Sequence, residues 1–180
     1  LQAKQMKADA EELGYEKGIC TSYIALGSAY GYSEQYAEGV EAYKEALKCP
    51  TISTREKLDT YWGLSGCYIG LKDEENAVII LNQEKEILEK LAGAKPTNYP
   101  LYRDRLLDNQ LRFCQLYAKI KEIPKLKSHL LIAKKHYTEN VFLPYYFQYH
   151  LSWADYYHLV QDWDACFPEL DLVLERSKGM

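Results

Sequence analysis

Four tyrosines recur along this chain, each near the end of a helical pattern and each in the same local setting. Three residues before each tyrosine stands a small residue, and one residue earlier a large apolar one. Nine residues after each tyrosine comes a further small or apolar residue. The tyrosines are Tyr30, Tyr68, Tyr117 and Tyr157, spaced by 38, 49 and 40 residues. This internal repeat constrains the fold more than any other feature of the sequence.

The spacing has a physical cause in the packing of helices. A small residue where two helices cross lets their axes approach to about 8–10 Å, and large neighbours fill the groove on either side. The preceding small residues are Gly27, Ser65, Cys114 and Ala154, and the following ones are Gly39, Ala77, Leu126 and Cys166. We therefore predict an all-α chain of helix hairpins, which must stack because no hairpin can bury its apolar face alone.

The pattern resembles the tetratricopeptide repeat family, of the kind found in bacterial sensor and regulatory proteins. The first unit carries the resemblance best, through Tyr23, Leu26, Gly27, Tyr30, Gly39, Tyr43 and Ala46. The second unit keeps most of these places, the third has Gln110 and Leu126 at two of them, and the fourth has His150. The resemblance implies a right-handed superhelical solenoid of stacked antiparallel helix hairpins, with about four repeats and an N-terminal half-repeat.

The repeat divides the chain into a half-repeat at 1–18 and repeats at about 19–53, 54–95, 99–140 and 143–178. We expect them to form a single domain at 1–180, as a fragment of a longer protein. Ser53 and Glu56 have the spacing of a capping box at a helix start. Three prolines, at 100, 124 and 144, suit first turns of helices. Pro168 predicts a kink or a late start in the last helix.

Composition narrows the possible functions. The net charge of −4 argues against a nucleic-acid surface, and no apolar run approaches the length of a membrane span. Six lysines between Lys119 and Lys135 suit either a docking patch for an acidic partner or, more simply, a solvated helix face. The motifs of phosphate-binding loops, hydrolases, metalloproteases and kinases are missing, so we expect no catalysis by this chain.

The cysteines and histidines show no metal-ligand spacing, so no metal and no cofactor are expected. Five cysteines, an odd number without a C-x-x-C motif, favour unpaired thiols and weakly favour the cytoplasm. Sensor kinases that resemble this chain carry such repeats in the periplasm. The sequence is therefore compatible with either the cytoplasm or the periplasm.

The resemblance also implies a concave groove lined by the first helix of each hairpin. Family members that clamp a C-terminal carboxylate place Lys and Asn where this chain has Ile24 and Ser28, so a chaperone-tail adaptor is disfavoured. The groove is instead expected to be apolar and aromatic, and to suit an extended or helical apolar peptide. Its candidate residues are Tyr32, Trp62, Ile69, Leu111, Arg112, Gln115, Asp155 and His158.

Aromatic residues are densest between Tyr137 and Trp163. Aromatic side chains with polar tips suit half-buried interfaces. We therefore expect an exposed patch of Tyr145, Tyr146 and Tyr149 that meets a following hairpin, a peptide or a second subunit, giving a homodimer in the last case.

Two functions follow from the resemblance. The first is a protein- or peptide-binding module in the sensory region of a larger bacterial signalling protein, such as a sensor histidine kinase of a two-component system or a transcription regulator. The second is a free-standing scaffold or assembly adaptor without an output domain. A receptor for peptide pheromones is a narrower alternative, which would require an Asn- or Arg-lined groove, and Arg112 and Gln115 are the two residues that suggest one.

Overall fold

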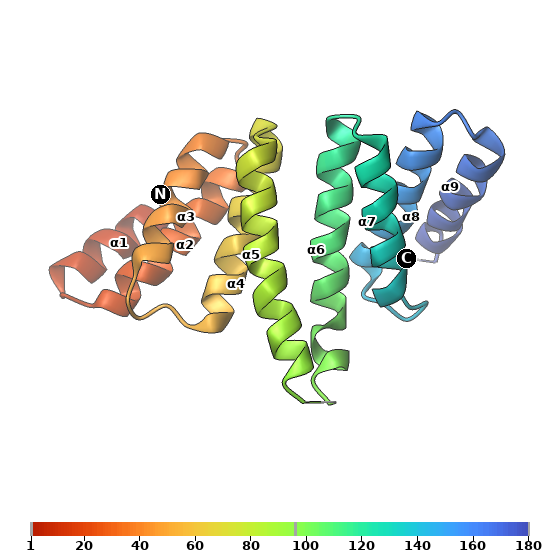
Figure 1. The fold of residues 1–180 in the computed structure, drawn as a ribbon. Coiled ribbons are helices and arrows are strands. Elements are labelled where there is room, and N and C mark those ends of the chain that lie inside the picture. Colours follow the sequence, from red (N-terminus) through yellow and green to blue (C-terminus); the bar gives the residue numbers. More distant parts are fainter. Residues whose placement is uncertain (1, 96, 180) are drawn as a thin grey trace. The chain divides into compact units, whose positions relative to one another are not determined.

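A computed structural model describes residues 2–95 and 97–179 of the chain, and in these ranges it contains helices and no strand (Figure 1). The all-α class predicted from the sequence is thus confirmed. The superhelical stacking of hairpins stays a prediction. The helices are α1 Gln2–Glu12, α2 Glu16–Tyr32, α3 Tyr36–Lys48, α4 Thr54–Leu71, α5 Glu74–Gly93, α6 Tyr99–Lys119, α7 Ile123–His136, α8 Leu143–Leu159 and α9 Trp163–Ser177.

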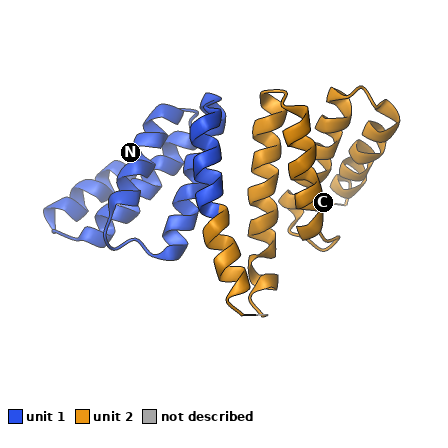
Figure 2. Ribbon diagram, in the orientation of Figure 1, with its two compact units in different colours: residues 1–84 blue, residues 85–180 orange. Residues whose placement is uncertain are grey.

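Each of the four predicted repeats contains two of these helices, and the predicted half-repeat contains α1 with the first residues of α2. The chain divides into two compact units, residues 1–84 and 85–180 (Figure 2). The division falls inside α5, whose first part belongs to unit 1 and whose last part belongs to unit 2. We describe the two units separately.

In unit 1, α1 and α3 both pack against α2, and α3 also packs against α4. The crossing of α2 and α3 is close because two glycines face each other there. A Cβ atom added to Gly27 would lie 2.7 Å from the Tyr43 ring, and one added to Gly39 would lie 3.4 Å from the carbonyl oxygen of Gly27. The predicted pairing of small residues at this crossing is confirmed.

In unit 2, α6 packs against α7 and α8, and α8 packs against α7 and α9. One core cluster contains Leu107 and Leu111 of α6 together with Tyr146 and Tyr149 of α8. A second small-residue crossing joins α8 to α9, where the Cys166 Sγ donates to the Ala154 carbonyl at 3.5 Å. These are the small residues that the repeat pairs in its fourth unit.

The helix starts follow the local sequence signals. Ser53 and Glu56 form the predicted capping box, with the Glu56 amide donating to Ser53 Oγ at 3.2 Å and the Ser53 amide donating to Glu56 Oε2 at 2.9 Å. The prolines at 100, 124 and 144 lie in the first turns of α6, α7 and α8, as predicted. The last helix does not start late: α9 begins at Trp163 and contains Pro168.

Candidate functional site

Unit 1 contains a groove of about 750 Å³ between α1, α2 and α3. Helix α2 provides the floor, and α1 and α3 provide the two walls. The three floor residues are Tyr23, Leu26 and Tyr30. The walls are lined by Lys4, Lys7, Ala8 and Glu11 from α1, and by Ala37, Glu38, Glu41, Ala42 and Glu45 from α3.

The floor is aromatic and half-buried, and lysines from the α1 wall lie over it. The Lys4 ammonium is 5.8 Å from the centroid of the Tyr30 ring, and the Lys7 ammonium is 5.1 Å from that of Tyr23. Lys7 also pairs with Glu11 at 2.9 Å, and this hydrogen bond raises the pKa of Lys7 above its ordinary value. The α1 lysines are therefore already engaged with groove residues.

The α3 wall presents a row of carboxylates. Glu38, Glu41 and Glu45 follow one another at intervals of three and four residues, which places them on one side of the helix. Two of them pair with lysines one turn further on, Glu41 with Lys44 at 3.4 Å and Glu45 with Lys48 at 2.5 Å. Glu38 is exposed and forms no ion pair with any residue that the structure describes.

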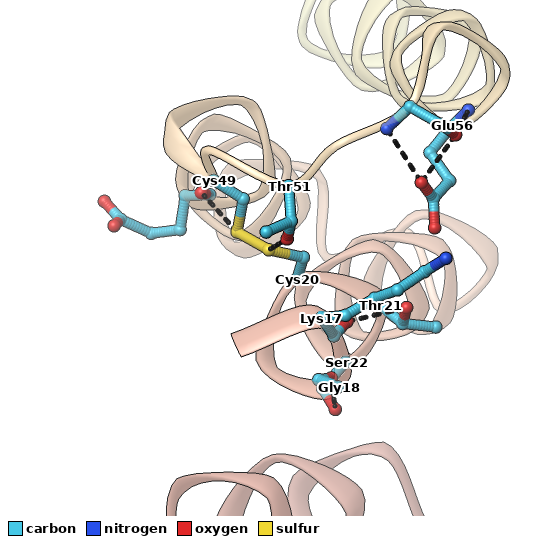
Figure 3. Close-up of a disulfide and its surroundings, with 10 residues drawn as sticks. Lys17, Gly18, Cys20, Thr21, Ser22, Cys49, Thr51 and Glu56 are labelled. Atoms are coloured by element: carbon cyan, nitrogen blue, oxygen red, sulfur yellow. Dashed lines mark hydrogen bonds between the residues drawn. A yellow bond between two sulfur atoms is a disulfide. The ribbon is translucent and has the colours of Figure 1, made fainter. Parts of the chain in front are cut away.

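A disulfide between Cys20 and Cys49 joins the second turn of α2 to the residue after α3, two of the helices that line this groove (Figure 3). The two Cα atoms are 5.8 Å apart. The expectation of unpaired cysteines is thus wrong for this pair. It is right for Cys67, Cys114 and Cys166, which are buried and form no disulfide with any described residue, and burial raises the pKa of Cys114 to about 12.

The residues predicted to line a concave groove lie in different environments in the structure. Tyr32, at the end of α2, is 84% exposed and Trp62 of α4 is 39% exposed, but neither lines the groove of unit 1. Three others are unavailable to a ligand, which corrects the prediction. Ile69 and Leu111 belong to the cores of their units, and Arg112 is buried with its Nε 3.5 Å from Asp108.

The remaining predicted groove residues are brought together in unit 2. Gln115, Asp155 and His158 line a hollow of about 320 Å³ with Lys119, between the C-terminal parts of α6 and α8. Desolvation in this hollow raises the pKa of Asp155 above its ordinary value, against an opposing effect of His158. The hollow thus combines four polar or charged side chains with an apolar part that includes Ala118 and Leu159.

The predicted aromatic patch is largely a core. Tyr146 and Tyr149 are 8% and 6% exposed and Tyr145 is half-buried, so the expectation of an exposed patch is wrong for the first two. They surround His150, whose Nδ1 lies 2.6 Å from Glu169 Oε2 and whose Nε2 lies 3.0 Å from the Tyr137 hydroxyl. Burial accounts for the density of aromatics in this segment.

The lysine-rich segment is a helix face that covers aromatic rings. The Lys125 ammonium lies 5.2 Å from the centroid of the Tyr117 ring, and that of Lys127 lies 5.5 Å from Tyr156. Such contacts let a lysine cover an apolar ring while its charge stays in water. These contacts agree with the simpler of the two expectations, that the segment is a solvated helix face.

The groove of unit 1 was not among the sites predicted from the sequence. Its floor residues were assigned to packing between helices, because they occupy repeat positions. The signal that could have found it lies in the walls, where acidic residues at 38, 41 and 45 share one helix face and lysines at 4 and 7 share another.

No family model matches the chain, and no curated protein and no solved structure matches it either. Among the described residues, no helix is long and apolar enough to cross a membrane. The same residues contain no group of three or more His, Cys, Asp or Glu side chains that could hold a metal ion.

Proposed function

We propose that this chain is a protein- or peptide-binding module, and that the groove of unit 1 binds a short amphipathic segment of a partner protein. The bound segment has an apolar face and a basic edge. The observation that carries this proposal is the combination of a half-buried aromatic floor with a row of three carboxylates along one wall.

The floor sets the size of the bound segment. Tyr23 and Tyr30 are seven residues apart on α2, which corresponds to about 10 Å along the helix axis. This length takes two turns of a helical peptide or three residues of an extended one. Because the contact is short, we expect binding in the weak range that is usual for transient recognition.

The charges set the polarity of the bound segment. Glu38 has no ion-pair partner among the described residues, and the pairs of Glu41 with Lys44 and of Glu45 with Lys48 are exposed. Exposed pairs contribute about 0–1 kcal/mol, so a ligand can displace them at little cost. The lysines of the opposite wall are held by tyrosine rings and by Glu11. The row of carboxylates is thus the charge that attracts a ligand, which favours a basic edge.

The wider role, as the sensory region of a signalling protein or as a free-standing scaffold, rests on the sequence resemblance and stays a prediction. Both roles require a site that binds a segment of another protein. The groove meets that requirement in either case.

The proposal is tested with two fluorescently labelled synthetic peptides of about 18 residues, the length of five helical turns. Both carry the same leucine face, and one has lysines along the edge where the other has glutamates. Fluorescence anisotropy measures their affinity for the oxidised chain. We expect the lysine-edged peptide to bind more tightly, and Glu38→Lys to weaken its binding about fivefold, the effect of roughly 1 kcal/mol.

The matched control is Glu12→Lys, which makes the same change of charge on an exposed residue of α1 that does not line the groove. It should leave the affinity unchanged within a factor of about two, because screening weakens distant surface charges. Equal affinity for the two peptides, or equal effects of the two substitutions, would contradict the proposal.

A further inference from the structure

We propose that Cys20 and Cys49 form a reversible thiol–disulfide site whose redox state controls the groove of unit 1. The effect on ligand binding rests on the function proposed above. The effect on the two helices does not, since it follows from the position of the disulfide alone.

The disulfide joins α2, which carries the floor of the groove, to the end of α3, which carries its acidic wall. Cys20 precedes the floor residue Tyr23 by three positions on α2, and Cys49 follows the wall residue Glu45 by four positions at the end of α3. The Sγ of Cys49 lies 3.8 Å from the carbonyl oxygen of Glu45 (Figure 3). A change at either sulfur therefore reaches a groove residue within one helical turn.

The two cysteines differ in their exposure to solvent, which gives the reaction a direction. Cys20 is 3% exposed, whereas Cys49 is half-buried and precedes the exposed residues Pro50 and Thr51. An incoming thiolate thus attacks the Cys49 sulfur, and Cys20 leaves as the thiolate. The Thr51 hydroxyl, whose Oγ1 lies 3.4 Å from the Cys20 sulfur, is placed to donate a hydrogen bond to that leaving group.

The reaction balances with a low-molecular-weight thiol such as glutathione as the co-reactant. The first thiol forms a mixed disulfide with Cys49, and the Cys20 thiolate takes up a proton. A second thiol then attacks the mixed disulfide, so that Cys49 becomes a thiol and the two co-reactants leave as their own disulfide. Two thiols are oxidised and one protein disulfide is reduced, and the reverse sequence restores the bridge.

The other three cysteines do not compete for this chemistry. Cys67, Cys114 and Cys166 are all buried. The Cys67 sulfur packs close to α2, since it would lie 3.5 Å from a Cβ atom added to Gly31. The Cys166 thiol is engaged with the Ala154 carbonyl in the α8–α9 crossing. Buried thiols of this kind are poorly reactive because attack requires an accessible thiolate.

Reduction frees the end of the acidic wall. Without the covalent bond, the end of α3 is held to the start of α2 by packing and by the contact between Cys20 and Thr51, and the Cys49 thiol can donate to the Glu45 carbonyl. The carboxylate row is then less fixed relative to the tyrosine floor. Because pre-organised sites bind more tightly than mobile ones, the reduced chain should bind the ligand more weakly than the oxidised chain.

The experiment equilibrates the whole chain in glutathione buffers of graded potential. Alkylation followed by peptide mapping identifies the disulfide, and amide hydrogen exchange reports on the last turn of α3 and the second turn of α2. We expect one reversible bond, between Cys20 and Cys49. Amides in these two turns should exchange about tenfold faster in the reduced state. A bond that does not respond to glutathione, or equal exchange in both states, would overturn the inference.

Two variants and the lysine-edged peptide separate this inference from the proposed function. The double variant C20S/C49S should exchange like the reduced chain at every potential, whereas Cys166→Ala should keep the full redox response. If the peptide binds the oxidised chain about fivefold more tightly than the reduced one, control of the groove is supported. If it binds both states equally, that control is overturned. If it binds neither state, the proposed function fails, and the exchange data alone decide whether the site is a redox-controlled one.

Discussion

The backbone carbonyl of Tyr30 accepts a hydrogen bond from the amide of Gln35 at 2.9 Å, across the turn that ends α2. The carbonyls of the other three repeat tyrosines each accept a hydrogen bond from the amide of the residue five positions later, at 2.9–3.0 Å. In each turn the residue four positions after the tyrosine has a positive φ of 58–62°: Glu34, Lys72, Lys121 and Gln161. This is the Schellman arrangement for ending a helix. The repeat in the sequence thus fixes where four helices stop.

The left-handed backbone conformation in these turns suggests a simple stabilising substitution. Gln161 has a φ of 60° and carries a side chain that this conformation disfavours. Gln161→Gly should therefore raise the free energy of unfolding by about 0.5–1 kcal/mol. Urea denaturation measures it. Substitution by glycine at Ser128, an exposed position inside α7, should lower stability by about 0.5 kcal/mol, and a loss of stability at both positions would contradict the interpretation of the turn.

Gly27 should tolerate no side chain. A Cβ atom there would lie 2.7 Å from the Tyr43 ring, so Gly27→Ala requires α2 and α3 to separate. We expect a loss of about 1–3 kcal/mol in the free energy of unfolding, as is usual for overpacked sites. The control is Gly93→Ala at the end of α5, where the added Cβ meets no atom within 4 Å apart from its chain neighbours and the backbone of its own helix. Similar effects at Gly27 and Gly93 in thermal or urea unfolding would refute the close crossing.

Reduction of the disulfide should destabilise the chain. Cys20 and Cys49 are 29 residues apart, and a loop of this length corresponds to about 3–4 kcal/mol in the chain-entropy description of cross-links. When dithiothreitol is added, we expect the free energy of unfolding to fall by this amount and the midpoint of urea unfolding to shift to a lower concentration. The variant C20S/C49S should unfold near the same midpoint with or without dithiothreitol. An unchanged midpoint on reduction would show that the bridge contributes nothing to stability.

His129 should give unit 2 a stability that depends on pH. It stacks on Phe113 with ring centroids 4.2 Å apart, and its Nδ1 lies 2.9 Å from Gln110 Oε1. Burial, reinforced by the charge of Lys85, lowers the pKa of His129 to about 4. An unfolded histidine titrates near 6.5, so the folded state loses stability as the pH falls from about 6.5 towards 4.

Between pH 7 and 5 this loss should amount to about 2 kcal/mol, and it should be absent in His129→Gln, which removes the titrating ring. Urea unfolding at the two pH values measures the difference between the proteins. An NMR titration of the His129 ring gives a direct check, and a midpoint near 6.5 would contradict the account.

Much of the fold was predictable because its signals are local. The small residues at 27, 39, 154 and 166 pair as the repeat requires, and the capping box at Ser53 forms as its spacing indicates. Local periodicity identifies which residues share a helix face. It does not show whether that face is covered by a neighbouring helix, and therefore Ile69 and Leu111 were predicted in a groove although both are buried.

The candidate site was harder to predict because it depends on what neighbouring helices leave uncovered. Tyr23 and Tyr30 occupy repeat positions, yet they stay half-buried because α1 and α3 pack on α2 with a groove between them. The sequence does contain a signal for the disulfide. Cys20 lies near the start of one helix and Cys49 at the end of the next, and a predicted hairpin brings those two positions together.

The most direct test of the proposed groove is an amide NMR titration of the oxidised chain with the lysine-edged peptide. The account predicts that shift changes concentrate in three segments, residues 4–11, 23–30 and 37–45, which line the groove. Glu38→Lys should reduce these changes at equal peptide concentration. Changes that concentrate instead around Gln115, Asp155 and His158, or the absence of any change at saturating peptide, would contradict it.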